Sequence, residues 1–196
     1  MTFRILDRKL LYKGFTRIEG FDVEQTTLDG RVQRIWREVE SHGSGAGVLI
    51  YDGRRRVAVL VRQLRLPIGL ILPEQALVLE VAAGLADAEG EDGAETARRE
   101  AHEEVGIVLG AVELAVHAFS TPGMSAERLS LYLADVDLAT ARVHAGGGLA
   151  DEQEDIEVVE LPLAELARLA DAGEIIDLKT FALVQTLRIR HPHLFA

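Results

Sequence analysis

The chain has 196 residues, of which 48% are hydrophobic and 27% are charged, a composition typical of one globular domain or of one domain with an extension. The formal net charge of −11 repels a phosphate backbone, so we expect no nucleic-acid partner. Cysteine is absent, which excludes disulfides, thiolate zinc sites and a cysteine nucleophile. No stretch reaches the ~18 apolar residues of a membrane span, and charges interrupt the start before a secretory segment can form. We therefore expect a cytoplasmic protein with no membrane partner.

Two β-hairpins are predicted near the N-terminus. Apolar and polar residues alternate on both sides of residues 28–31, which is typical of a hairpin. A second hairpin joins residues 47–51 to residues 57–61 through Asp52 and Gly53, and its strands are apolar enough to lie at the centre of a sheet.

Strands and helices alternate in the rest of the chain. The pattern predicts strands at 76–81, 116–119, 129–133 and 156–161, a helix that begins after Gly93, a helix at 163–172 ended by Gly173, and a last helix at 178–190. This mixed order favours an α+β fold with an N-terminal hairpin extension. We expect the extension to comprise residues 1–42 and the main domain residues 43–196.

Three glutamates stand out on the helix that follows Gly93. Glu100, Glu103 and Glu104 are three and four residues apart, so a helix places them on one face. Like charges at this spacing destabilise a helix by about 0.2–0.5 kcal/mol per pair, so the arrangement makes sense chiefly when a cation compensates. Oxygen ligands of this kind suit a hard divalent cation.

The other residues of this helix fit the same interpretation. Small side chains on the adjacent face would let the helix lie close to a sheet: Ala94, Ala97, Ala101 and Val105. Arg99 stands four residues before Glu103 and can orient its carboxylate. Gly106 suits the left-handed position that ends a helix. By itself, however, E-x-x-E-E is more often a solvated acidic face with arginine pairs.

The residues around E-x-x-E-E favour the cation site over a solvated acidic face. Residues 99–107, REAHEEVGI, reproduce R-E-U-x-E-E-x-G-U, where U is apolar, and Glu91 stands eight residues before Arg99. The segment resembles the Nudix hydrolase box, G-x5-E-x7-R-E-U-x-E-E-x-G-U. It departs from the box in one respect: six residues separate Gly84 from Glu91 instead of five, so the loop that enters the helix is one residue longer.

The resemblance covers most of the chain. Residues 79–84, LEVAAG, look like the L-E-x-x-A-G that precedes the box in nucleoside diphosphate sugar hydrolases, and residues 120–127, STPGMSAE, are similar to their S-P-G-x-x-x-E loop with Thr121 inserted. The late segments AGGGLADEQEDIEVVELPLAEL and GEIIDLKT look most like bacterial GDP-mannose pyrophosphatases, with ADP-ribose pyrophosphatases next. The implied fold is the Nudix α/β/α sandwich with a mixed sheet.

The resemblance also implies a metal site and a catalytic base. The metal ligands would be the Glu100 and Glu104 carboxylates and the backbone carbonyl of Ala83, with Glu103 close by. Mg²⁺ favours this set because it takes few carboxylates and completes its octahedron with waters and phosphate oxygens, and Mn²⁺ is a possible substitute. The base aligns at Glu152, with Glu154 as a close alternative and Glu103 as another catalytic candidate. Without the resemblance, a solvated acidic loop is the preferred interpretation of residues 151–155.

Four further residues are implied to contact substrate. Arg37 and Glu38 match an R-E pair that often reaches the site across a dimer interface, so a homodimer is expected. Arg65 would suit a phosphate by its planar fork, and Glu127 ends the S-P-G-type loop. A surface salt bridge is at least as probable for the arginines on sequence grounds alone. The six histidines show no spacing typical of metal ligands, so none is assigned to metal.

The function that follows is Mg²⁺-dependent cleavage of the pyrophosphate of a nucleoside diphosphate sugar, with GDP-mannose giving GMP and mannose 1-phosphate. One alternative is an ADP-ribose pyrophosphatase, which gives AMP and ribose 5-phosphate. Another is a Nudix-fold regulator that binds a nucleotide sugar without cleaving it. The intact Glu100, Glu103 and Glu104 argue against that regulator, because a pure binder has no need of the stacked charge.

Overall fold

The structure is a computed structural model that describes residues 2–86, 92–149 and 154–196. The chain divides into two compact units. The N-terminal unit comprises residues 1–44 and 118–128, and the core unit comprises residues 45–117 and 129–196. Each unit is described by itself.

The N-terminal unit contains a three-stranded antiparallel sheet in the order β1-β2-β3, formed by Phe3–Lys13, Arg17–Thr26 and Val32–Ser41. The hairpin predicted around residues 28–31 is present as β2 and β3. Gly30, with φ of 85°, provides the left-handed backbone that its turn requires. The sequence pattern did not predict β1, which pairs with β2 as a third strand.

Residues 120–127 belong to the N-terminal unit, although the sequence did not associate them with the extension. The loop lies parallel to the end of β3 at the bridge between Glu40 and Ser125. The Glu40 N–H donates to the Met124 carbonyl at 2.9 Å, and the Ala126 N–H donates to the Glu40 carbonyl at 3.1 Å. These bonds fix the loop against β3.

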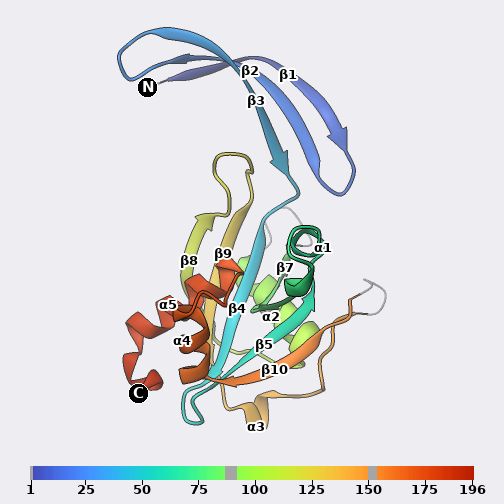
Figure 1. The fold of residues 1–196 in the computed structure, drawn as a ribbon, viewed down its shortest axis with the longest axis vertical. Helices are drawn as coiled ribbons and strands as arrows, with labels where there is room; N and C mark the ends of the chain where they lie inside the picture. Colours follow the sequence, from blue (N-terminus) through green and yellow to red (C-terminus); the bar gives the residue numbers. More distant parts are fainter. Residues whose placement is uncertain (1, 87–91, 150–153) are drawn as a thin grey trace. The chain divides into compact units, whose positions relative to one another are not determined.

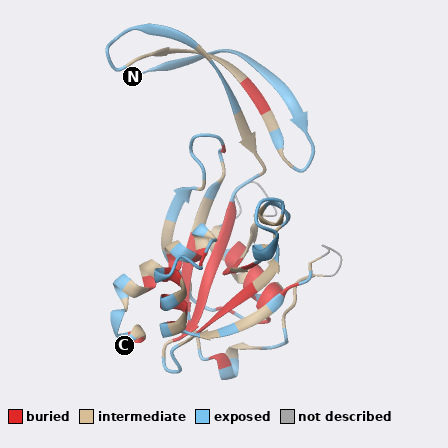
Figure 2. Cartoon of the chain, in the orientation of Figure 1, coloured by how far each residue is buried: buried red, intermediate tan, exposed pale blue. Residues whose placement is uncertain are grey.

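The core unit is built on a mixed sheet in the order β10-β5-β4-β9-β8, with β6 paired to β5 and β7 paired to β4. Its strands are β4 (Gly45–Asp52), β5 (Val57–Leu64), β6 (Leu77–Glu80), β7 (Ala82–Leu85), β8 (Glu113–Phe119), β9 (Arg128–Asp135) and β10 (Glu157–Pro162). The last two residues of β8 and the first residue of β9 are counted with the N-terminal unit. Strand β4 is parallel to β9 and antiparallel to β5 and β7. Every residue of β4 is buried, which matches its apolar sequence (Figure 2).

Helices cover both faces of this sheet (Figure 1). On one face, α2 (Gly93–Val105) packs Ala97, Ala101 and Val105 against the side chains of β4 and β5. On the other face, α4 (Leu163–Asp171) and α5 (Leu178–Arg190) pack their leucines against Leu49 and Leu60. The predicted α/β/α sandwich is therefore confirmed. Short helices complete the unit: α1 (Leu66–Gly69), α3 (Leu138–Ala141) and the 3-10 turns η1 (Pro73–Gln75) and η3 (Pro192–Phe195).

Helix α2 begins and ends as its sequence indicates. The Asp92 carboxylate caps the first turn by accepting from the Ala94 N–H at 3.1 Å. Gly106 ends the helix with φ of 68°, and its N–H donates to the His102 carbonyl at 3.0 Å. A Cβ at Gly106 would lie 2.1 Å from the His144 carbonyl oxygen, so a larger residue has no room there. None of the helices among the described residues is long and apolar enough to cross a membrane.

Candidate active site

Two carboxylates of α2 are buried in the core unit. Glu100 is 7% exposed and Glu104 is 1% exposed. Burial raises the pKa of Glu100 to about 7, with the charge of Glu103 adding to the effect. Burial together with the negative charge of Glu100 raises the pKa of Glu104 to about 8. The protein therefore holds two carboxylates close together where a cation would stabilise their charged forms.

Strand β7 forms the wall opposite these carboxylates. The Ala83 N–H donates to Glu104 Oε2 at 3.0 Å. A Cβ at Gly84 would lie 1.9 Å from Glu100 Oε1, so the glycine makes room for this carboxylate. The N–H and C=O of one strand residue point to the same side, so the Ala83 carbonyl lies on the edge of β7 that meets α2. The two carboxylates therefore lie against the strand that carries Ala83 and Gly84.

Arg99 links the carboxylates of α2 to β7. Its Nη1 lies 2.8 Å from Glu100 Oε1 and 2.9 Å from Glu103 Oε2. Its Nη2 donates to the Leu85 carbonyl at 2.9 Å. Arg99 therefore orients Glu103, as the four-residue spacing predicts, and it offsets part of the negative charge of this face.

The glycine run 146–148 brings Glu154 toward the same site. The Gly147 N–H donates to the Glu104 carbonyl at 2.8 Å, which places this run against the end of α2. Glu154 Oε2 accepts from the Leu149 N–H at 3.0 Å. The negative charge of Glu154 contributes to the raised pKa of both Glu100 and Glu104. Glu152 and Glu91 lie outside the described residues.

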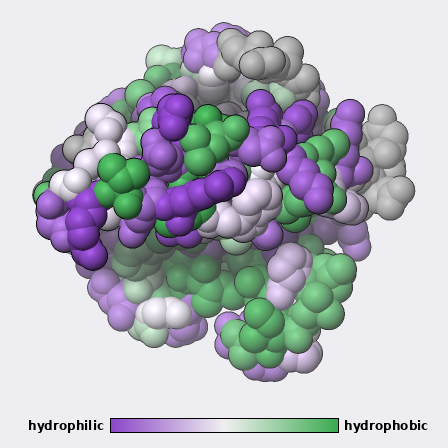
Figure 3. Space-filling model, turned by 90° about the horizontal axis from the view of Figure 1, so that it is seen from above, coloured by the Kyte–Doolittle hydropathy of each residue, from purple (hydrophilic) through white to green (hydrophobic). Residues whose placement is uncertain are grey.

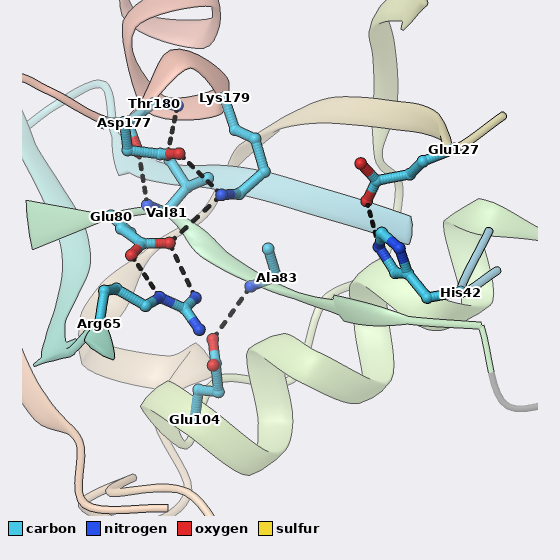
Figure 4. A network of polar contacts seen from close by, with 10 residues as sticks. All are labelled: His42, Arg65, Glu80, Val81, Ala83, Glu104, Glu127, Asp177, Lys179 and Thr180. Atoms are coloured by element: carbon cyan, nitrogen blue, oxygen red, sulfur yellow. Dashed lines mark hydrogen bonds and ion pairs between the residues drawn. The ribbon is translucent and has the colours of Figure 1, made fainter. Parts of the chain in front are cut away.

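Arg65 lies between two carboxylates in the core unit (Figure 4). It forms a two-point ion pair with Glu80, with Nε–Oε1 at 2.6 Å and Nη2–Oε2 at 2.9 Å, and Glu104 lies on its other side. Lys179 Nζ also reaches Glu80 Oε2, at 3.2 Å. The motifs L-E-x-x-A-G and GEIIDLKT contain Glu80 and Lys179, but the sequence alone gave neither residue a role.

The other predicted substrate residues lie in the N-terminal unit. Arg37 and Glu38 are exposed on β3, and Arg37 Nη1 donates to the Trp36 carbonyl at 2.9 Å. Glu127 Oε1 lies 3.3 Å from His42 Nε2, and His42 Nδ1 lies 2.7 Å from Glu40 Oε1. His42 therefore sits between two carboxylates, a partnership that its isolated position in the sequence did not reveal.

The His42 contacts predict a pH dependence of stability. Burial alone would lower the pKa of His42, but the hydrogen bond to Glu40 and the charges of Glu127 and Glu40 outweigh it and raise the pKa. Because the pKa of His42 is higher in the folded protein than in the unfolded chain, this stabilisation is complete below the unfolded-state pKa of about 6.5. It is lost as pH rises through the folded-state pKa. We expect the thermal midpoint of wild type to be higher than that of His42→Gln, and we expect the difference to be larger at pH 6 than at pH 9. An equal difference at both pH values would contradict the charged pairing.

The donor set around α2 fits a hard divalent cation. Its donors are carboxylate and carbonyl oxygens, and Mg²⁺ typically takes one or two carboxylates and fills its other positions with waters and substrate phosphates. Within the described ranges no three His, Asp or Glu side chains are already grouped as a metal site. Glu100, Glu104 and the Ala83 carbonyl are the groups that would hold such an ion.

In the core unit, helices cover a mixed sheet, and the carboxylate-bearing helix α2 packs beside the glycine-containing strand β7. The NUDIX domain family matches residues 41–183. The chain belongs to the Nudix family.

Curated relatives match nearly the whole chain. It is 37% identical to a GDP-mannose pyrophosphatase of Pectobacterium atrosepticum over 95% of this chain and 94% of that protein. It is 34% identical to a GDP-mannose pyrophosphatase of Cronobacter sakazakii over 97% of both chains, and 33% identical to one of Escherichia coli over 93% of both. These matches confirm the predicted enzyme class, a Nudix pyrophosphatase.

A solved structure supports the fold independently. A crystal structure described as an ADP compounds hydrolase superposes with a TM-score of 0.74 over 98% of this chain and 96% of that chain. Its sequence identity is 17%, so the likeness concerns the fold alone. The predicted Nudix fold is thereby confirmed.

Proposed function

We propose that the chain is a Mg²⁺-dependent Nudix hydrolase that cleaves the pyrophosphate of a nucleoside diphosphate sugar, and that GDP-mannose is its substrate. The observation that carries this proposal is the pair of buried carboxylates, Glu100 and Glu104, set against Ala83 and Gly84. The choice of substrate is supported by the curated relatives, which are named GDP-mannose pyrophosphatases.

The proposed reaction is hydrolysis at one phosphorus. The oxygen of a water molecule bonds to phosphorus, the bond from that phosphorus to the bridging oxygen breaks, and the bridging oxygen leaves with the other phosphate. GDP-mannose and water then give GMP and mannose 1-phosphate. Bound Mg²⁺ would polarise the diphosphate and lower the pKa of a coordinated water.

The chain's own groups have three tasks in this reaction. Glu100, Glu104 and the Ala83 carbonyl hold the cation, and Arg99 keeps Glu103 beside them. Arg65 offers N–H donors to a phosphate oxygen. A carboxylate of the acidic loop accepts the proton of the attacking water, and Glu152 is the proposed base, with Glu154 as the alternative and Glu103 as the next candidate.

A product assay tests this function. With Mg²⁺ present, the enzyme is offered GDP-mannose, ADP-ribose, GDP-glucose, UDP-glucose and NADH, and the products are separated by chromatography. We expect GMP and mannose 1-phosphate with the highest kcat/KM. A preference for ADP-ribose would support the ADP-ribose pyrophosphatase, and saturable binding without any product would support the non-catalytic regulator.

The N-terminal unit supports the proposal of a homodimer. Strand β1 is exposed along its whole length, and it carries apolar side chains: Phe3 is 73%, Ile5 51% and Tyr12 56% exposed. On the face of the molecule that is seen from above, hydrophobic side chains are exposed among hydrophilic ones (Figure 3). A second copy of the chain would bury such groups, and Arg37 and Glu38 would then serve the partner's site.

Removal of the N-terminal strands should therefore affect both assembly and activity. We expect sedimentation of wild type to show a dimer, and a variant that lacks residues 1–42 to be monomeric with much lower kcat/KM. The single variant Arg37→Ala, in an intact dimer, should raise KM. A wild-type monomer that stays fully active at nanomolar concentration would contradict the proposal.

A further inference from the structure

Glu80 is a buried carboxylate to which the proposed reaction assigns no task. It ends β6 and is 3% exposed. Both of its oxygens are engaged: Oε1 accepts from Arg65 Nε, and Oε2 accepts from Arg65 Nη2 and from Lys179 Nζ. One buried anion thus holds two cations that come from distant parts of the chain (Figure 4).

The second cation is itself fixed at the start of α5. Asp177 caps this helix through the Thr180 N–H at 2.9 Å, and its other oxygen lies 2.7 Å from Lys179 Nζ. The Thr180 hydroxyl accepts from the Val81 N–H at 2.8 Å. The contacts therefore tie the start of α5 to residues 80 and 81, directly before the strand that carries Ala83.

With respect to the residues that the structure describes, the pair with Glu80 leaves one edge of the Arg65 guanidinium available. The two bonds to Glu80 use the Nε hydrogen and one hydrogen of Nη2, and a guanidinium has five N–H donors in a fixed plane. The three remaining N–H groups point away from Glu80. Glu104 lies on that side (Figure 4), and the positive charge of Arg65 acts to lower the Glu104 pKa.

A cavity of about 250 Å³ adjoins this arrangement. Arg65, Glu80, Asp177 and Lys179 line it together with apolar side chains that include Ile68 and Ile176. The two cations are balanced by two carboxylates, so the cavity has no large excess of positive charge to attract an anion. The contacts with Glu80 instead fix the orientation of the Arg65 guanidinium.

We propose that Glu80 is a positioning residue, which holds the Arg65 guanidinium so that its open edge meets a phosphate oxygen beside Glu100 and Glu104. The inference rests on the proposed function, because it takes a diphosphate as the ligand. A long arginine side chain loses much rotamer freedom when it binds, and a rigid two-point partner removes that cost beforehand. Stability gives a weaker reason for Glu80, because buried ion pairs often contribute little to it.

A double-mutant cycle tests the proposal. Glu80→Gln keeps the shape of the side chain but loses the charge and one of the two acceptors for Arg65. Misplacement of a positioned group by about 1 Å can lower rates about 10²-fold, so we expect kcat/KM to fall by about 10-fold to 100-fold, largely through KM. Because Glu80 acts through Arg65, the double variant with Arg65→Ala should be no worse than Arg65→Ala alone.

Two further variants separate positioning from folding. Arg65→Lys keeps the charge without the two-point geometry, so it should lose nearly as much kcat/KM as Arg65→Ala even if Glu80→Gln does not fold. Glu157→Gln removes the partner of Arg62 in an exposed arginine-glutamate pair at 2.8 Å, and it should leave kcat/KM unchanged. Independent losses that multiply in the double variant, or full activity of Arg65→Lys, would overturn the proposal.

Calorimetric titration with inorganic pyrophosphate and Mg²⁺ provides a readout besides activity. We expect Glu80→Gln to weaken pyrophosphate binding about 10-fold or more, and to have no further effect when Arg65 is already alanine. If wild type hydrolyses none of the nucleotide sugars but binds pyrophosphate with this pattern, the proposed function fails and the role of Glu80 stands. If wild type does not bind pyrophosphate, the role of Glu80 fails as well.

Discussion

Replacement of Glu104 or Glu100 by glutamine is expected to lower kcat by several orders of magnitude while the fold is retained. Each variant removes one of the two buried charges that would hold the cation, and a neutral amide is a poor substitute for a carboxylate toward Mg²⁺. The carboxamide keeps nearly the same shape, so the packing of α2 against β7 should survive.

The same variants should not lose stability when metal is absent. In the folded protein the pKa values of Glu100 and Glu104 are about 7 and about 8, whereas a glutamate in the unfolded chain has a pKa of about 4.3. The folded state therefore loses stability as pH rises from about 4.3 through the folded-state pKa values. Glutamine avoids that cost. The thermal midpoint of the metal-free variants should therefore equal or exceed that of wild type, and the difference should be larger at pH 8 than at pH 5.

The measurements are kcat with Mg²⁺ or Mn²⁺ and the thermal midpoint with and without metal. Wild type should gain stability on addition of Mg²⁺, whereas Glu104→Gln should gain little. A matched control on the same helix is Glu95→Gln, whose carboxylate is exposed and pairs with Arg98 at 2.7 Å. Near-wild-type kcat in Glu100→Gln or Glu104→Gln would contradict the metal assignment.

The sequence was sufficient for the parts of this site that depend on local spacing. Glu100 and Glu104 lie four residues apart, and small residues on the neighbouring face of α2 dictate which side meets the sheet. Gly106 ends α2 with the left-handed backbone that its position in the sequence predicts. These features depend on the spacing of residues within a single helix or strand, so they can be predicted from the sequence.

Contacts between distant segments could not be predicted in this way. Lys179 and Glu80 are 99 residues apart, and Ser125 and Glu40 are 85 residues apart. No periodic pattern connects such pairs, because their approach depends on how the sheet orders its strands and where α5 begins. The assignment of Arg65 illustrates the difference, since the family resemblance implied a phosphate contact for this residue but not the Glu80 carboxylate that fixes its direction.

The remaining prediction concerns the base that accepts the proton of the attacking water. Glu152 belongs to an acidic run, residues 151–155, that follows a glycine run and precedes β10. The family resemblance places the base at the first glutamate of this run, outside the described residues. Glu154 is the structural competitor, because its charge acts on both Glu100 and Glu104, but one of its oxygens already accepts from the Leu149 N–H.

We therefore expect Glu152→Gln to lower kcat by about 10²–10⁴, the usual cost of losing a general base, and Glu154→Gln to have a much smaller effect. Mg²⁺ affinity, measured by calorimetry in both variants, should change little, since neither residue is a proposed metal ligand. Asp155→Asn, one residue further along, is the matched control for loss of a loop charge. A large loss at Glu154 with none at Glu152 would move the base two residues along the chain. No loss at either position would return the search to Glu103 or to the loop that ends at Glu127.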